Sequence, residues 1–426
     1  MNYYSLHHKA PKVSFKEAVI KGLAPDRGIY FPENITPLSD EFIQNIDQYS
    51  HEEIAFEAIK QFVGDDIPND ILKEIITETL SFDFPVVPIE DNIGTLELFH
   101  GPTMAFKDVG ARFMARCLGY FNRDKEEKVT VLVATSGDTG GAVANGFLGV
   151  KGVDVVILYP SGKVSEIQEK QLTTLGQNIT ALEIDGVFDD CQDMVKTAFL
   201  DTEIERTLTS ANSINIARWL PQMFYFFFAY KAVHKQHKNI VFSVPSGNFG
   251  NICAGIMAQK LGLPIQHFIA STNVNDTVSN YLENGEYVPK KSIATISNAM
   301  DVGNPSNFIR IQELYNNDLA TIKQHFSSYS FTDSETKAAM KAIHNQHNYI
   351  ADPHGAVGYL GLKNHDLQGA YGIFLETAHP VKFLPTVEST LSLKLDIPSQ
   401  IQEIMHKEKH AIQAADYDDL KRFLNT

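Results

Sequence analysis

Short runs of β-branched and apolar residues alternate with helix-like segments from residue 95 to residue 378, and this alternation limits the possible folds. The runs are continuously apolar, which is typical of strands that are buried on both faces. Such strands, separated by helices, predict an α/β fold with a mostly parallel sheet covered by helices. The expected strands are residues 95–100, 129–136, 153–160, 179–184, 239–246, 265–271 and 371–378.

The segments outside this alternation are predicted to be largely helical. Residues 1–90 contain two acidic amphipathic stretches, 51–63 and 68–81, and helical patterns return at 398–424. We therefore expect an additional N-terminal helical domain. The predicted domains are residues 1–90, a lysine- and substrate-anion-binding domain at 91–240, and a large phosphate-binding domain at 241–426.

Charge and composition exclude several classes of partner. The formal net charge is -16 and no Lys/Arg-rich run occurs, so the surface repels phosphate backbones and anionic lipid. The longest apolar run, Met223–Tyr230, is too short to span a membrane. The N-terminus lacks the apolar core of a signal peptide, which predicts a cytoplasmic protein. Three widely spaced cysteines match no metal-ligand pattern and are expected to be buried thiols, and no metal site is predicted.

Residues that follow the strands are the candidates for chemistry, because ligands of parallel sheets bind beyond the carboxyl ends of strands. The first such junction, FHGPTMAFKDVGARF, places Lys107 between a strand end and a helix start. A lysine here could simply be exposed to solvent. The apolar Ala105 and Phe106 before it favour a different reading, since an amine held against apolar surface has a lowered pKa and becomes a nucleophile and base. Asp108 is placed to cap the helix or favour its dipole.

Two further junctions combine a buried strand, a glycine-rich turn and a helix. VATSGDTGGAVANGF could hold a carboxylate or phosphate, or could be a structural turn, and it lacks both the dinucleotide and the P-loop spacing. VFSVPSGNFGNICAG has two glycines that let the backbone approach a ligand, and its helix start suits a dianionic phosphate. The last junction, FLETAHPVKF, ends a strand with Thr377 and His379, which could also be structural. A phosphate site, an anion site and a lysine at one sheet edge are what a pyridoxal-phosphate (PLP) enzyme acting on an amino acid requires.

A series of motifs then resembles the threonine synthase family, in its bacterial and fungal-type branch. In family order these are LELFHGPTMAFKD, ATSGDTGGAVA, ILYPSGKVSEIQEKQ, SANSINIAR, SVPSGNFGN, STNVNDTV, SNAMDVGNPSN and TAHPVKF. The opening segment from Tyr3 to Ile35 is similar to the family's N-terminal domain, so the resemblance covers nearly the whole chain. Two positions depart from the family pattern. Arg27 stands where several relatives have glycine, and position 251, here Asn, varies between Asn and Asp.

The resemblance implies a fold-type II PLP enzyme, related in architecture to the tryptophan synthase β-subunit. It implies conversion of O-phospho-L-homoserine and water to L-threonine and phosphate, the last step of threonine biosynthesis. Lys107 would carry PLP and, once released, act as the base at the substrate Cα. Thr377 would face the pyridine nitrogen. The residues implied to hold the cofactor phosphate are Gly247, Asn248, Phe249, Gly250 and Asn251.

The substrate-binding residues follow from the same motifs. The candidates for the substrate carboxylate are Thr135, Ser136, Gly137, Asp138 and Thr139. Because Asp138 is itself an anion, we expect its side chain to point away or to meet a donor. Lys163 and Ser165 are candidates for the substrate phosphate, although Lys163 could equally be a solvated loop lysine.

Three alternatives share part of this pattern. Another fold-type II lyase, such as a threonine dehydratase, would have the same lysine and phosphate loop. A non-catalytic relative would bind PLP or a metabolite without turnover. A nicotinamide-dependent dehydrogenase is disfavoured because no dinucleotide fingerprint follows any strand. The sequence leaves the oligomeric state open between monomer and homodimer.

Overall fold

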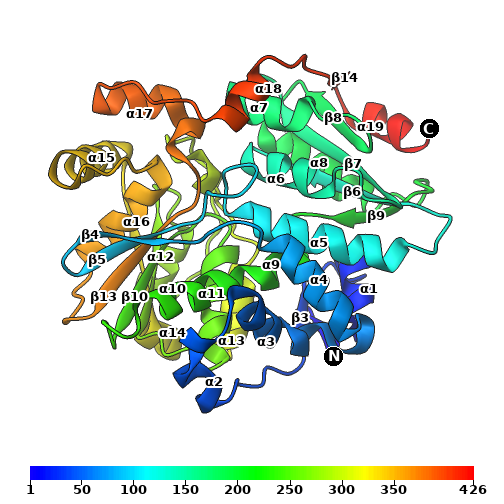
Figure 1. Cartoon of the computed structure of the whole chain (residues 1–426). Coiled ribbons are helices and arrows are strands. Elements are labelled where there is room, and N and C mark those ends of the chain that lie inside the picture. The colour runs from blue at the N-terminus through cyan, green and yellow to red at the C-terminus, as the bar shows by residue number, and fades with distance from the viewer.

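The computed structural model describes residues 1–426 and places the predicted parallel strands in two separate sheets (Figure 1). The six-stranded sheet is parallel except for its edge strand β4 (Val86–Glu90), which pairs antiparallel with β5 (Ile93–Glu97). The fold class implied by the resemblance, mostly parallel sheets covered by helices, is confirmed, although the strand runs alone suggested a single sheet. Apolar runs identify buried strands but do not show which strands pair. In spatial order the sheet contains β12 (Phe326–Ser330), β11 (His267–Thr272), β10 (Ile240–Pro245), β13 (Tyr371–Glu376), β5 (Ile93–Glu97) and β4 (Val86–Glu90).

The second sheet has five strands, and every neighbouring pair in it is parallel. All seven predicted strands are confirmed within a few residues, but β4, β9, β12 and β14 were not predicted. These four are short edge strands with weaker apolar runs, so periodicity alone does not reveal them. In spatial order the sheet contains β14 (Ile412–Ala414), β8 (Ile179–Ile184), β7 (Val153–Pro160), β6 (Val129–Ala134) and β9 (Thr207–Ser210).

Each sheet takes strands from more than one of the predicted domain segments. β4 and β5 at residues 86–97 join the sheet of β10 and β13, whereas β14 near the C-terminus joins the sheet of β6 to β8. Figure 1 shows the red C-terminal segment returning to the five-stranded sheet. The predicted domain boundaries at residues 90 and 240 stay a prediction. The chain passes from the six-stranded to the five-stranded sheet between β5 and β6, returns between β9 and β10, and passes again between β13 and β14.

Helices cover both sheets, as the alternation of the sequence predicts. The helix-like segments between the expected strands form helices, for example those that begin at Lys107, Glu166 and Phe188. The helices are α5 (Lys107–Asn122), α6 (Asp138–Phe147), α7 (Glu166–Thr173), α8 (Phe188–Ala198), α9 (Ile216–Trp219), α10 (Phe224–Val233), α11 (Gly250–Lys260), α12 (Thr277–Asn284), α13 (Phe308–Leu314), α14 (Leu319–His325), α15 (Asp333–His347), α16 (Pro353–Asn364), α17 (Leu384–Leu391), α18 (Ser399–Met405) and α19 (Tyr417–Leu424).

The N-terminal segment contains a small sheet that the sequence reading missed. β1 (Asn2–Ser5), β2 (Val13–Ser14) and β3 (Tyr30–Pro32) pair antiparallel beside the expected helices. These helices are α1 (Phe15–Lys21), α2 (Asp40–Gln44), α3 (His51–Val63) and α4 (Asn69–Thr79). Arg27, in the loop before β3, has a φ of 66°. This left-handed conformation favours glycine and explains why glycine suits the position.

The long apolar run of the sequence forms the buried helix α10. Its aromatic residues pack on several sides, for example Phe226 against Phe242 and Phe84 against Tyr225 and Phe228. A helix that is apolar all round is expected in the core of a large protein. No helix of the chain is both long and apolar enough to cross a membrane. The three cysteines are buried and unpaired, which confirms the prediction of buried thiols.

A buried acidic pair joins the end of β13 to the start of α16. Asp352 is the N-cap of α16, and its backbone N–H donates to Glu376 Oε2 at 3.3 Å. Glu376 Oε1 and Asp352 Oδ2 are both buried and accept no hydrogen bond from a donor in the protein. Burial, followed by the nearby charge of Asp352, raises the pKa of Glu376 well above its usual range. Glu376 therefore holds its proton to a higher pH than an ordinary glutamate, and this proton can be donated to Asp352.

Asp352 also fixes the 3₁₀ turn at Asn298–Met300 through His354. His354 Nδ1 lies 2.7 Å from Asp352 Oδ1, while its Nε2 accepts from the Ala299 N–H at 3.2 Å. The proton of this imidazole is thus on Nδ1, where it is donated to Asp352. Through this chain of contacts Glu376, the residue before Thr377, is connected to the backbone at Ala299.

Glu376→Gln is expected to make the protein lose less stability than the wild type as the pH rises. A carboxyl with a raised native pKa stabilises the fold below its unfolded pKa of about 4.3, and this stability is lost as the pH rises towards the native pKa. Glu376→Gln keeps the size and the hydrogen-bond donor but cannot ionise. The difference in thermal unfolding midpoint, variant minus wild type, should grow between pH 5 and pH 9.

Glu205→Gln, at an exposed glutamate, is the matched control and should show no such trend. A constant difference for Glu376→Gln across this pH range would contradict a protonated Glu376.

Candidate active site

The loop that carries Lys107 is bonded through its backbone to the end of β13. The Phe106 N–H donates to the Thr377 carbonyl at 2.9 Å, and the His379 N–H donates to the Met104 carbonyl at 3.0 Å. Ala105 and Ala378 form an antiparallel bridge between these two bonds. Two of the predicted site residues, Lys107 and Thr377, are therefore held side by side although they are far apart in the sequence.

Lys107 is the first residue of α5, and its surroundings favour the neutral amine. The side chain is partly exposed, and Nζ lies 5.6 Å from the centre of the Phe106 ring. Burial lowers the pKa of Lys107 below that of an ordinary lysine. Asp138 opposes this shift, whereas Lys382 and Arg218 add to it. The expectation that the apolar surroundings lower the pKa of this amine is confirmed.

Asp108 closes the same loop instead of capping the helix. Its carboxylate accepts from both the backbone N–H and the hydroxyl of Thr103. Burial raises the pKa of Asp108, although the two bonds from Thr103 oppose the rise. The residue thus fixes the turn at 103–108 from which Lys107 projects.

The loop between β10 and α11 has the backbone form that a phosphate site requires. Phe249 adopts a left-handed conformation with a φ of 60°, and no side chain caps the start of α11. A Cβ at Gly247 would lie 2.6 Å from Cα of Met300, so only glycine fits there without a shift of the neighbouring chain. The free N–H groups at the start of α11 form a ready anion site.

Asn251 supplies a separate indication that a polar ligand belongs at this loop. The residue lies in the first turn of α11 and is 6% exposed, yet neither its side-chain oxygen nor its nitrogen has a hydrogen-bond partner. An unpaired buried amide costs free energy. A phosphate at the helix start would supply acceptors for its N–H groups, so the residues present fit the phosphate of PLP.

The segment 210–218 links the phosphate loop to Lys107. Ser213 Oγ accepts from Asn248 Nδ2 at 3.0 Å and from Asn307 Nδ2 at 2.9 Å. Arg218 donates through Nη1 to the Lys107 carbonyl at 3.1 Å. This segment is the SANSINIAR motif of the sequence, whose contribution the sequence reading did not assign.

The turn after β6 follows a strand of the five-stranded sheet. Some of its residues shape the turn, and others are free to bind a ligand. Thr135 Oγ1 accepts from the N–H groups of Gly137 and Gly140 at 3.0 and 2.8 Å and is 3.1 Å from the Gly137 carbonyl. Its hydroxyl is thus occupied in shaping the turn. Ser136 and Thr139 are partly exposed, and their hydroxyls make no hydrogen bond within the protein. These two are the free polar side chains at the start of α6.

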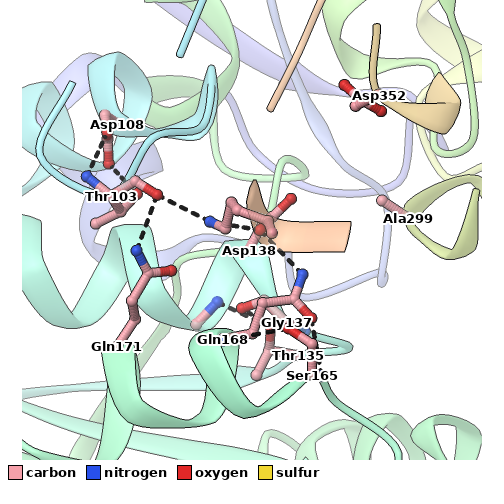
Figure 2. A network of polar contacts seen from close by, with 12 residues as sticks. Thr103, Asp108, Thr135, Gly137, Asp138, Ser165, Gln168, Gln171, Ala299 and Asp352 are labelled. Atoms are coloured by element: carbon pink, nitrogen blue, oxygen red, sulfur yellow. Dashed lines mark hydrogen bonds and ion pairs between the residues drawn. The ribbon is translucent and has the colours of Figure 1, made fainter. Parts of the chain in front are cut away.

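Asp138 meets donors, as expected for a carboxylate in an anion site. Lys382 Nζ lies 2.6 Å from its Oδ1, and Gln168 Nε2 donates to the same oxygen at 3.0 Å (Figure 2). Burial alone would raise the pKa of Asp138, but the charges of Lys382 and then Lys107 hold it well below its usual range. Lys382 was missed as a separate candidate, although it lies within the TAHPVKF motif.

The two residues predicted for the substrate phosphate have different surroundings. Ser165 is the N-cap of α7, where its hydroxyl accepts from the Gln168 N–H in a capping box. Lys163 is exposed and makes no ion pair. Thr377 and His379 follow the last predicted strand. Of these two residues, His379 caps the turn Pro380–Phe383, and burial lowers the pKa of its imidazole to about 4. His379 is therefore neutral near pH 7.

Comparison with known families gives three matches along the chain. Residues 95–373 match the pyridoxal-phosphate-dependent enzyme family, residues 2–80 match the threonine synthase N terminus, and residues 355–424 match the threonine synthase C-terminal family. The chain is 44% identical to the threonine synthase of Buchnera aphidicola subsp. Baizongia pistaciae, over 100% of this chain and 99% of the relative.

Solved structures of similar proteins have the same fold over the whole chain. Threonine synthase from Escherichia coli superposes with a TM-score of 0.94 at 42% identity, covering 100% of this chain and 99% of that one. PLP-bound threonine synthase from Brucella melitensis also gives a TM-score of 0.94, at 34% identity and with the same coverage of both chains. This fold-type II architecture, with an N-terminal domain, is the one predicted. The chain belongs to the threonine synthase family of pyridoxal-phosphate-dependent enzymes.

Proposed function

We propose that this protein converts O-phospho-L-homoserine and water to L-threonine and phosphate, with PLP attached to Lys107. The observation that carries the proposal is the pairing of Lys107 with Thr377 through the backbone bonds at Phe106 and His379. The phosphate loop that follows β10, in the same sheet, adds the second element of a cofactor site. The reaction is the last step of threonine biosynthesis.

The cofactor would be held by residues that follow two strands, β10 and β13. Gly247, Asn248, Phe249, Gly250 and Asn251 would hold its phosphate. The hydroxyl of Thr377 would face its ring nitrogen, and a neutral hydroxyl leaves that nitrogen less protonated than a carboxylate would. When bound, PLP stabilises the negative charge that forms on a substrate carbon next to the amine.

Lys107 is assigned the proton transfers. Its lowered pKa supports a neutral amine that can take the proton from the substrate Cα and later return one there. Loss of a second proton from Cβ lets phosphate leave from Cγ. Protonation at Cγ, addition of water at Cβ and the return of the proton to Cα complete L-threonine.

The substrate carboxylate is assigned to the turn after β6. Ser136 and Thr139 have free hydroxyls, and Asp138 contributes a backbone N–H group at the start of α6, whereas the Gly137 N–H already donates to Thr135. Thr135 shapes this turn. Lys163 would meet the substrate phosphate, while Ser165 would act mainly by capping α7, since its hydroxyl already accepts a bond there.

The full-length similarity separates this proposal from its rivals. A dehydratase-like lyase would share the lysine and phosphate loop, but the matches at residues 2–80 and 355–424 are to threonine synthase segments. A non-catalytic relative is disfavoured because Lys107, the phosphate loop and Thr377 are all present. We further propose a location in the cytoplasm and no nucleic-acid or membrane partner. Either a monomer or a homodimer is compatible with the proposal.

Lys107→Ala is expected to abolish both the visible absorbance of bound PLP and the reaction. Wild-type protein incubated with O-phospho-L-homoserine should release phosphate and threonine in equal amounts, without the ammonia that a dehydratase would form. Lys128→Ala, at an exposed lysine, is the control and should retain both properties. Turnover by Lys107→Ala at the wild-type rate, or ammonia as the main product of the wild type, would refute the proposal.

Asn251→Leu is expected to weaken PLP binding without destabilising the protein that lacks PLP. Leucine has a similar size and removes the unpaired buried amide, so the unfolding midpoint of the cofactor-free variant should be unchanged or higher. Loss of a hydrogen bond to a charged phosphate should raise the Kd for PLP about 10- to 100-fold. Fluorescence titration with PLP and thermal unfolding measure the two effects.

Asn122→Leu is the matched control, because Asn122 is also buried with an unpaired side-chain oxygen but lies at the far end of α5. It should leave the Kd for PLP unchanged. An unchanged Kd in Asn251→Leu would remove this residue from the phosphate site.

A further inference from the structure

A buried ion pair connects the two sheets next to Lys107. Asp138 begins α6, which follows β6 of the five-stranded sheet, and Lys382 lies in the turn after β13 of the six-stranded sheet. Their charged atoms are 2.6 Å apart, and the side chains of Lys382 and Asp138 are 0% and 4% exposed. The pair is therefore shielded from solvent and salt, and its field acts at close range.

The pair is also attached to the loop from which Lys107 projects. Lys382 Nζ donates to the Thr103 carbonyl at 2.9 Å, and Gln171 of α7 donates to the same carbonyl at 3.0 Å. Thr103 in turn binds Asp108, the residue after Lys107. Figure 2 shows Thr103 and Gln168 on opposite sides of Asp138 in this network. Loss of either charge would therefore change the electrostatic environment of the Lys107 amine.

Stability alone gives no reason for an ion pair here, because well-packed apolar residues of similar volume are often at least as stabilising as a buried pair. The charged groups around Lys107 are few. Arg218 keeps its charge at all relevant pH values, and His379 is neutral near pH 7. Asp108 is bonded to Thr103, and the Tyr225 hydroxyl donates to the Phe106 carbonyl. Asp138 and Lys382 are left as the two groups of opposite sign that act on the amine.

We propose that the Asp138–Lys382 ion pair is a positioning element that balances the charge on the nitrogen of Lys107. Asp138 on its own would hold this nitrogen in its protonated form. Lys382 on its own would oppose protonation. Together they let Lys107 both take up and release a proton, as the transfers at the substrate Cα require. Lys382 is thereby assigned a function in the reaction that acts through Asp138 and Lys107.

The test is the pH dependence of the visible absorbance of bound PLP, measured without substrate. The inference rests on the attachment of PLP to Lys107, and the absorbance reports the protonation of the nitrogen that they share. Lys382→Met removes a positive charge and should raise the midpoint of the titration by about one pH unit. Asp138→Asn removes a negative charge and should lower it by a similar amount. A purely structural contribution would not move the two midpoints in opposite directions.

The double variant Asp138→Asn/Lys382→Met keeps the test decisive where a single variant does not fold. Removal of both partners leaves no unpaired buried charge, so the double variant should be more stable than either single variant. Asp138 acts more strongly on Lys107 than Lys382 does. The midpoint of the absorbance titration should therefore fall in the double variant, but by less than in Asp138→Asn. The control is Lys394→Met at an exposed ion pair, which should leave the midpoint unchanged.

The inference would be overturned if the midpoints of the single variants were unchanged or shifted with the same sign. If the single variants do not fold, an unchanged midpoint in the double variant would overturn it. The proposed reaction is tested separately. If wild-type protein shows no visible band with PLP, the attachment to Lys107 fails. If the band is present and the variants do not move it, only the function assigned to the ion pair fails.

Discussion

Two backbone hydrogen bonds determine where the chemistry of this protein can take place. They join the loop before α5 to the residues after β13, and they bring Lys107 next to Thr377. Backbone bonds of this kind do not depend on the identity of the side chains, so the lysine can be packed for reactivity without losing its position. The loop is closed independently by Asp108 and Thr103. A lysine on an unfastened loop would have the exposure and the ordinary pKa of a surface amine.

The second sheet contributes what the first cannot supply. β5, β10 and β13 bring together the lysine, the phosphate loop and the ring partner, and the charge that Lys382 supplies near Lys107 from the turn after β13 is positive. The turn after β6 adds Asp138 and the free hydroxyls of Ser136 and Thr139. The site is therefore built between two sheets, with the Asp138–Lys382 contact as a direct electrostatic link between them.

The sequence predicted the parts of this site that depend on local pattern. Apolar runs located Lys107, residues 246–251 and Thr377, because each follows a strand that periodicity identifies. The separation into two sheets was not predicted, since strand pairing depends on contacts far apart in the sequence. The antiparallel sheet at β1 to β3 was missed because strands of two to four residues produce no periodic signal.

Buried ionisable residues were hardest to predict. Lys382, Asp352 and Glu376 are ionisable residues in otherwise apolar or loop segments, and a sequence gives no measure of which partner each will meet. Their motifs could have raised the question, because a charged residue inside an apolar run such as YGIFLETAHPVKF must find a partner or change its protonation when buried. Partner choice follows only from the fold, which places Lys382 on Asp138 and Glu376 beside Asp352.

The departures from ordinary packing gather around one region, and this concentration is itself an argument for a ligand. Phe249 is left-handed, the Asn251 amide has no partner, and a lysine lies against apolar surface, all at ends of strands in the same sheet. Each feature costs free energy in the protein alone. The cost is recovered when a phosphate pairs with Asn251 and the helix start, and when the amine of Lys107 is bonded to a cofactor. A fold selected only for stability would replace these residues, so their joint presence supports a site built around PLP.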